Sequence, residues 1–125
     1  MRKLLLVHDR TFVREQFAQM VSTIADISLA GQVGTVAAAL DVLKTLTPDI
    51  IILDLQSPDG HGFEVLNVVK RLLPRTRVIA LTNYPFPQNK RRAIAAGAEY
   101  FFDKSLEFEK VVDMLKESNQ HSIQV

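Results

Sequence analysis

The chain has 125 residues, of which 47% are hydrophobic and 23% charged, and its formal net charge is +1. This length suits one globular domain, and the composition excludes a disordered chain. The absence of cysteine excludes disulfide frameworks, thiolate zinc sites and cysteine nucleophiles, and the near-neutral charge gives no indication of a nucleic-acid or anionic-membrane partner.

The first part of the chain alternates short apolar runs with helical patterns. Lys3–Val7 is an apolar run of strand length, and Ile27–Val33 predicts a second strand. Thr35 can cap a second helix, which Pro48 stops. Between the two strands, apolar residues recur at the helical spacing i, i+4, i+7 and i+11: Val13, Phe17, Met20 and Ile24.

The middle of the chain repeats this alternation. Asp49–Leu53 predicts the third strand, with Asp54 at its end, and Arg77–Leu81 predicts the fourth, ending at Thr82. A helix that Pro74 closes is predicted between them. Its inward face consists of four apolar residues: Phe63, Leu66, Val69 and Leu73.

The last part contains one more strand between two helices. Lys90–Ala96 predicts a short helix that Gly97 can terminate, and Glu99–Phe102 predicts the fifth strand, ending near Lys104. Ser105 can cap a final helix. The apolar residues of that helix are Leu106, Val111, Val112 and Leu115.

Five β–α repeats with apolar strands indicate a parallel sheet that helices cover on both faces. We therefore predict an α/β fold with a five-stranded parallel sheet in the order 2-1-3-4-5. No composition shift divides the chain, so we predict one domain over residues 1–118 and a C-terminal tail over residues 119–125.

Polar side chains directly follow four of the five strands: Asp9, Asp54, Thr82 and Lys104. With this strand order they face one pocket, because ligands of open α/β sheets bind outside the carboxyl ends of the strands. Two neighbouring carboxylates need a cation, and hard oxygen ligands with room for water suit Mg²⁺. A hydroxyl and an ammonium group opposite them suit a phosphoryl group. The four residues together predict acyl-phosphate chemistry on an aspartate.

Each of these residues also has a simpler explanation. Asp9 could cap a helix, Thr82 could close a strand, and Lys104 could be an ordinary surface lysine. Their coincidence at four strand ends favours a shared site over four separate structural roles.

The pattern resembles the receiver domain of two-component response regulators, a flavodoxin-like (βα)5 sandwich, over about residues 3–117. The matching segments are "LLLVHD", "PDIIILDLQSPDGHGFEVL", "VIALT" and "AAGAEYFFDKS". The most specific is D-x-x-x-P-D-G from Asp54 to Gly60, with Lys104 at the expected distance. The resemblance implies that Asp54 accepts a phosphoryl group from a phosphohistidine. It also implies Mg²⁺ ligated by the side chains of Asp9 and Asp54 and by the backbone carbonyl of Gln56.

The resemblance implies further roles along the chain. Thr82 would hydrogen-bond the phosphoryl group and move toward it, and Lys104 would pair with phosphoryl oxygens. Phe101 would be the rotating aromatic residue of the switch. The fourth helix, fifth strand and last helix would form the relay surface, on which the basic cluster Lys90–Arg92 falls.

The chain departs from the family pattern at four positions. His8 replaces one of the two acidic residues that usually follow the first strand, and Asn83 stands where a small residue is usual and could crowd the entry of the phosphodonor. Ser57 replaces a commonly apolar residue. Ser105 replaces the proline that usually follows the lysine, so we expect a trans Lys104–Ser105 peptide bond.

We interpret the chain as a stand-alone response regulator that catalyses only its own phosphorylation and dephosphorylation. The expected partners are a sensor histidine kinase or phosphotransfer protein and a downstream protein target, with no direct contact to nucleic acid and no membrane. We expect a monomer or weak dimer. We also expect it in the cytoplasm, because the four apolar residues in "MRKLLLVHD" are too few for the apolar region of a signal peptide.

Two other function classes remain open from the residues. A degenerate receiver would bind partners without phosphorylation, and His8 and Asn83 favour it. A small phosphatase of the haloacid dehalogenase type also uses an aspartate nucleophile, but it carries an acid where Gln56 stands two residues after Asp54. A flavodoxin-type flavin carrier would need a Ser/Thr/Gly-rich loop after the first strand, and "HDRTF" is not one.

Overall fold

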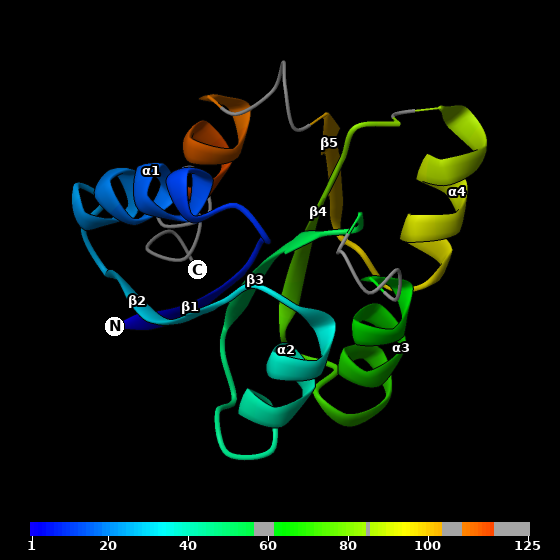
Figure 1. The fold of residues 1–125 in the computed structure, drawn as a ribbon, viewed down its shortest axis with the longest axis horizontal. Helices are drawn as coiled ribbons and strands as arrows, with labels where there is room; N and C mark the ends of the chain where they lie inside the picture. The colour runs from blue at the N-terminus through cyan, green and yellow to red at the C-terminus, as the bar shows by residue number, and fades with distance from the viewer. Residues whose placement is uncertain (57–61, 85, 104–108, 117–125) are drawn as a thin grey trace.

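The computed structural model describes residues 1–56, 62–84, 86–103 and 109–116. Five parallel strands form one sheet in the order β2-β1-β3-β4-β5, which confirms the predicted fold and strand order (Figure 1). The strands are β1 (Arg2–Val7), β2 (Ile27–Val33), β3 (Ile50–Asp54), β4 (Arg77–Thr82) and β5 (Tyr100–Asp103). The helices are α1 (Thr11–Ser22), α2 (Val36–Val42), α3 (Gly62–Leu72) and α4 (Pro87–Ala95), and residues 109–116 are also helical.

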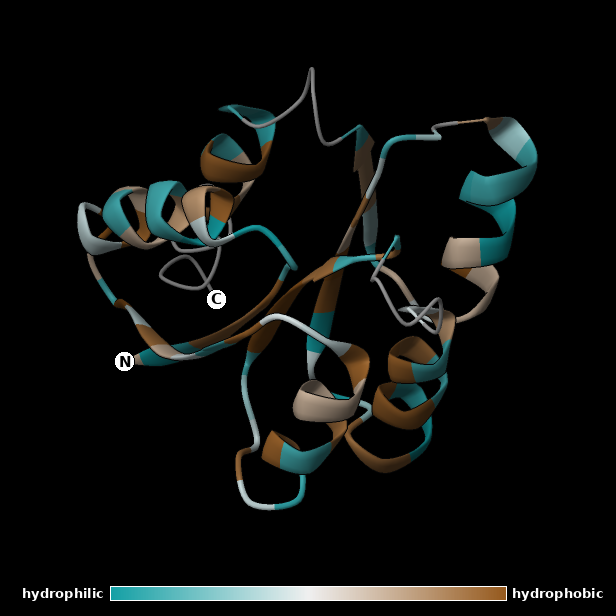
Figure 2. Ribbon diagram, in the orientation of Figure 1, coloured by the Kyte–Doolittle hydropathy of each residue, from teal (hydrophilic) through white to brown (hydrophobic). Residues whose placement is uncertain are grey.

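Successive residues of each central strand belong to two different apolar cores. In β1, Leu4 and Leu6 pack with α1 and residues 109–116, whereas Leu5 and Val7 pack with α2, α3 and α4. Figure 1 shows α1 and the C-terminal helical segment, residues 109–116, on one side of the sheet and the other three helices on the opposite side. Figure 2 shows the central strands as nearly continuous apolar runs. Strands buried on both faces explain why the sequence shows apolar runs rather than alternation.

The helix ends follow their local sequence with one shift. The Thr35 side chain accepts a hydrogen bond from the Ala38 backbone N–H at 3.1 Å, which confirms the predicted cap of α2. Gly97 follows α4 with φ +116°, a conformation that favours glycine. However, α4 begins at Pro87 rather than at Lys90, because proline is well suited to the first turn of a helix, where no intrahelical N–H donor is needed.

The start of α3 lies very close to the end of β3. A Cβ atom at Gly62 would lie 2.5 Å from the Leu55 carbonyl oxygen and 2.7 Å from its Cα. Only glycine allows this approach without movement of the backbone. The contact fixes α3 beside the end of β3, next to Asp54 and Gln56.

Strands β1 and β3 lie side by side although β2 lies between them in sequence. Val7 pairs with Leu53, so the residues that follow β1 lie next to the end of β3. This is the point at which strand order reverses, where ligands bind in open parallel sheets. In the described part of the chain, no helix has the length and apolar character that crossing a membrane requires.

Candidate functional site

Three strands bring polar side chains to one edge of the sheet. His8 and Asp9 follow β1, Asp54 is the last residue of β3, and Thr82 is the last residue of β4. Asp54 pairs with Leu81 in the sheet register, so the ends of β3 and β4 are also adjacent. The buried side chains among them are His8, Asp54 and Thr82, with exposed fractions of 3%, 1% and 1%.

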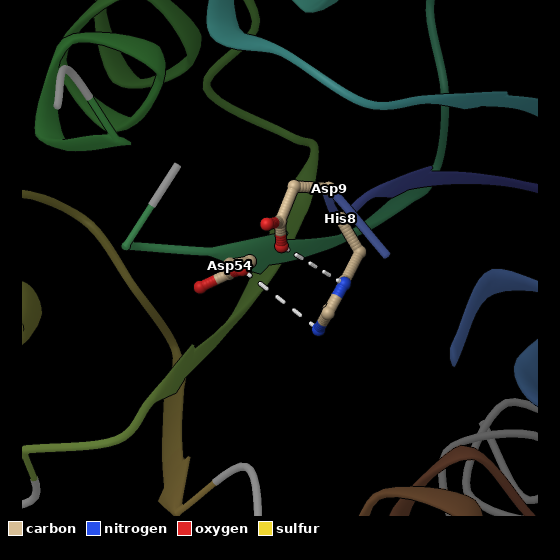
Figure 3. Close-up of side chains that lie close together, drawn as sticks. All are labelled: His8, Asp9 and Asp54. Atoms are coloured by element: carbon tan, nitrogen blue, oxygen red, sulfur yellow. Dashed lines mark ion pairs between the residues drawn. The ribbon is translucent and has the colours of Figure 1, made fainter. Parts of the chain in front are cut away.

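Both carboxylates lie beside the His8 imidazole, each near a different ring nitrogen (Figure 3). His8 Nδ1 lies 3.5 Å from Asp9 Oδ1, and His8 Nε2 lies 3.8 Å from Asp54 Oδ2. One ligand atom from each of the three residues falls within 4.8 Å of the other two. Asp9 remains partly exposed, with a side-chain exposure of 33%, so the site opens to solvent on its side.

Asp9 does not cap the following helix. The N-cap position of α1 is Arg10, and no side chain makes the cap hydrogen bond there. The Asp9 carboxylate therefore has no capping role at this strand end, which removes the simpler explanation for this residue.

Backbone and arginine contacts fix His8. The Arg10 backbone N–H donates to His8 Nδ1 at 3.1 Å, and Arg14 Nη1 donates to the His8 carbonyl oxygen at 2.7 Å. The His8 N–H donates to the Val33 carbonyl of β2 at 3.0 Å. The imidazole is thus held in one place beside both carboxylates.

Gln56 bridges the loops that follow β3 and β4. Its backbone N–H donates to Asp54 Oδ1 at 2.9 Å, which fixes one oxygen of the carboxylate. Its side-chain Oε1 accepts from the Asn83 backbone N–H at 2.8 Å. Asn83 itself is exposed. The bridge connects the carboxylate of β3 to the loop after β4.

Thr82 and Phe101 lie on the neighbouring strands β4 and β5. The Thr82 Oγ1 accepts from the Tyr84 backbone N–H at 2.9 Å, so its hydroxyl hydrogen can be donated elsewhere. Phe101 is half-buried and packs against the core that α2, α3 and α4 cover. Its partner in the sheet register is Ala80, and Thr82 pairs with Asp103.

Three positions of the expected site fall outside the described residues: Ser57, Lys104 and Ser105. The predicted lysine contact and the trans Lys104–Ser105 bond therefore remain predictions. The same holds for the proposed C-terminal tail.

The donor set fits a hard divalent cation. Asp9 and Asp54 supply carboxylate oxygens from adjacent strands, and one side of the site is open to water. Carboxylates together with water are the ligands that Mg²⁺ prefers. The imidazole of His8 is a softer ligand that suits transition metals better, so the fit rests on the two aspartates.

The sequence pattern did not point to Arg14 or to the side chain of Gln56. Arg14 lies on the polar face of α1, where arginines are ordinary, and its contact is with a backbone carbonyl. The Gln56 contact joins two loops 27 residues apart. Neither interaction has a signal in residue type or spacing.

Comparisons with known proteins agree with this geometry. The family model described as response regulator receiver domain matches residues 4–116. The DNA-binding transcriptional activator DevR/DosR of Mycobacterium tuberculosis is 30% identical over 106 residues, which cover 85% of this chain and 49% of that protein. Response regulator protein VraR of Staphylococcus aureus is 28% identical over 118 residues, covering 94% of this chain and 56% of that protein.

A solved structure shows the same fold. The signal receiver domain of the DNA-binding response regulator merR from Colwellia psychrerythraea 34H superposes with a TM-score of 0.86 at 24% identity. The superposition covers 96% of this chain and 99% of that one.

The relatives correct one expectation. We expected no nucleic-acid partner from the net charge of +1, and that expectation is wrong, because DevR/DosR and merR are named as DNA-binding proteins. The chain spans about half the length of the curated relatives that it matches, 49% and 56%. The charge of this span alone therefore carries no information about DNA binding.

Proposed function

The chain belongs to the response regulator receiver domain family, and from that premise we propose that it accepts a phosphoryl group on Asp54 and signals by a change of surface. The observation that supports this most directly is the position of Asp54. Its carboxylate is buried at a strand end, held by the Gln56 N–H at 2.9 Å, and lies within 4.8 Å of Asp9. A second carboxylate beside a buried one favours the binding of a cation, which offsets their repulsion.

The proposed reaction is a phosphoryl transfer from a phosphohistidine of a sensor kinase or phosphotransfer protein. An Asp54 carboxylate oxygen attacks phosphorus, the P–N bond breaks with its electron pair remaining on the donor imidazole, and a mixed carboxylic–phosphoric anhydride forms. A magnesium ion held by Asp9, Asp54 and the Gln56 carbonyl would offset the negative charge of the incoming group. The domain would catalyse no reaction beyond its own phosphorylation and dephosphorylation.

Three further residues would assist this transfer. Gln56 holds one oxygen of the Asp54 carboxylate and so fixes its rotamer. The Thr82 hydroxyl hydrogen is available to a phosphoryl oxygen, because its oxygen already accepts from Tyr84. We propose that Lys104 supplies the positive charge opposite the aspartates.

We propose that the output runs through the surface of α4, β5 and residues 109–116. Helix α4 buries only Ala93, whereas α3 buries four residues. Two contacts join α4 to α3. The Arg92 guanidinium carbon lies 3.9 Å from the centre of the Phe63 ring, and Lys70 Nζ donates to the Ala95 carbonyl at 3.1 Å. A helix with so little buried surface can shift at low cost.

The names of the relatives suggest where this output leads. We propose that the relay surface of this receiver controls the activity of a DNA-binding unit. Two-component signalling of this kind needs no chemistry at the relay surface, only a difference in affinity between the two states.

The test is phosphoryl transfer to this protein from a phosphorylated histidine donor or from acetyl phosphate in the presence of Mg²⁺. We expect labelling of the wild-type chain, none of Asp54→Asn, and strongly reduced labelling of Asp9→Asn. Asp41→Asn serves as a matched control, because it removes a carboxylate that is 77% exposed and pairs with Lys44 rather than with the site. Wild-type labelling that chelation of divalent ions leaves unchanged would contradict the metal requirement.

A further inference from the structure

The contacts of His8 define which ring nitrogen carries its proton. A backbone amide can only donate, and the Arg10 N–H lies 3.1 Å from His8 Nδ1. Nδ1 is therefore the acceptor, and the neutral imidazole carries its hydrogen on Nε2. This is the nitrogen that lies nearest Asp54, 3.8 Å from Oδ2 (Figure 3).

The ring is held so that this hydrogen stays near the carboxylate. His8 is 3% exposed, its N–H is bonded to Val33 in β2, and its carbonyl accepts from Arg14 Nη1 at 2.7 Å. Arg14 is fixed in turn by Thr11, whose Oγ1 accepts from Nη2 at 3.1 Å. A separation of 3.8 Å is longer than a hydrogen bond, and a movement of less than about 1 Å by either side chain closes it to hydrogen-bond length.

We propose that His8 is a positioning residue that donates an Nε2–H hydrogen bond to the Asp54 carboxylate and so competes with the cation for its charge. The inference rests on the proposed function of Asp54 and extends it to how tightly the site binds its cation. When no cation is bound, the N–H stabilises the buried carboxylate beside Asp9. When a cation binds, it must displace or outweigh this donor, so affinity is lower than with a third carboxylate.

The same contacts argue against His8 as a metal ligand. Ligation through Nε2 needs the lone pair there, which moves the proton to Nδ1 and removes the acceptor of the Arg10 N–H. The cation is therefore held by the aspartates, and His8 acts on it through Asp54.

Two substitutions of His8 distinguish the effect of its Nε2–H donor from the effect of the imidazole ring itself. In His8→Gln the amide N–H falls near the position of Nε2 and can still reach Asp54. In His8→Asn the shorter amide falls near Nδ1 and cannot. We expect Mg²⁺ to bind His8→Gln within about twofold of wild type and His8→Asn roughly two- to fivefold more tightly, because only the second variant loses the competing charge-assisted donor.

A spectroscopic measurement on the wild-type protein makes the test independent of these variants. The chain has three histidines, and the His8 signals are assigned by their absence from His8→Gln. We expect ¹⁵N side-chain spectra in the absence of metal to show His8 in its Nε2–H form, and addition of Mg²⁺ to leave that form in place.

Three results overturn the proposal: an Nδ1–H form of His8, a His8 nitrogen that becomes metal-bound on addition of Mg²⁺, or equal Mg²⁺ affinities for His8→Gln and His8→Asn. None of these readouts needs phosphorylation. If the spectra and affinities come out as expected but Asp54 takes no phosphoryl group, only the proposed function fails.

Discussion

At the scale of single residues, the site combines groups that the sequence could place and contacts that it could not. Asp54 and Thr82 directly follow an apolar run and Asp9 follows one after His8, so a parallel sheet had to bring them to the same edge. The hydrogen bond from Arg10 to His8 and the bridge from Gln56 to Asn83 depend on loop conformation. Residue spacing carries no information about such contacts.

The substitution His8→Asp tests the electrostatics of this position. An acid there adds a third negative charge about 5 Å from the cation, which in a watery site is worth about 1–2 kcal/mol. We expect Mg²⁺ to bind several-fold to about tenfold more tightly, and the metal-free protein to be modestly less stable because the carboxylates repel one another. Calorimetric titration and denaturant unfolding measure the two effects. Unchanged or weaker Mg²⁺ binding would contradict this electrostatic account of the position.

At the scale of elements, periodicity and turn residues placed the strands more closely than the helices. The predicted Ile27–Val33 strand matches β2, whereas β5 begins and ends one residue later than predicted. Helix α4 starts three residues earlier than predicted, because Pro87 occupies its first position. The apolar pattern did not indicate this start, because the first turn of α4 buries no side chain.

The contact between α3 and β3 predicts a large effect of one methyl group. In Gly62→Ala the new Cβ would lie 2.5 Å from the Leu55 carbonyl oxygen, so backbone must move. We expect a loss of about 1–3 kcal/mol in unfolding free energy, the usual range for overpacking. Gly31→Ala is the matched control, because its Cβ would meet the flexible Leu5 side chain at 3.3 Å. Equal stability of the two variants would contradict the close approach.

An ion pair between β4 and the residue before β5 predicts a pH-dependent contribution to stability. Arg77 Nε and Nη2 each donate to Glu99 at 2.8 Å, and this hydrogen bonding lowers the pKa of Glu99. A carboxyl group whose pKa is lowered by folding stabilises the native state above its unfolded pKa, and this contribution is lost as pH falls through the folded value. Both side chains are more than a third exposed, so solvent screening limits the effect to less than about 1 kcal/mol.

Unfolding of wild type and Glu99→Gln at neutral and acidic pH checks this contribution. We expect the variant to be less stable at pH 7 and the difference to shrink in acid, where Glu99 is protonated in the wild type. A difference that stays constant with pH would assign the effect to packing rather than to charge.

At the scale of the whole molecule, the two faces of the sheet carry separate apolar cores. Helix α1 and residues 109–116 close one core, while α2, α3 and α4 close the other, to which α4 contributes one fully buried residue, Ala93. The proposed relay starts at the edge that carries Asp54 and Thr82, passes through Phe101, and ends at the surface of α4, β5 and residues 109–116. The predicted domain limits, residues 1–118, remain a prediction.

This arrangement predicts coupled movement of Thr82 and Phe101. Beryllofluoride with Mg²⁺ mimics the phosphorylated state, and we expect it to draw the Thr82 hydroxyl inward and vacate space for the Phe101 ring. Side-chain NMR should show both residues shifting together. Thr82→Ala should uncouple them, while Thr82→Ser retains the hydroxyl and should retain the coupling. A Phe101 ring that keeps one rotamer in both states would exclude this route.

The central claim is that Asp54 is the phosphoacceptor, and the most direct test is to map the modified residue. The protein is incubated with acetyl phosphate and Mg²⁺, the acyl phosphate is reduced with borohydride, and the peptides are identified by mass spectrometry. The account predicts that Asp54 alone is converted to homoserine, and that neither Asp54→Asn nor a chelated sample gives this product. Conversion at another carboxyl group, or none at Asp54 while a known receiver reacts under the same conditions, would contradict it.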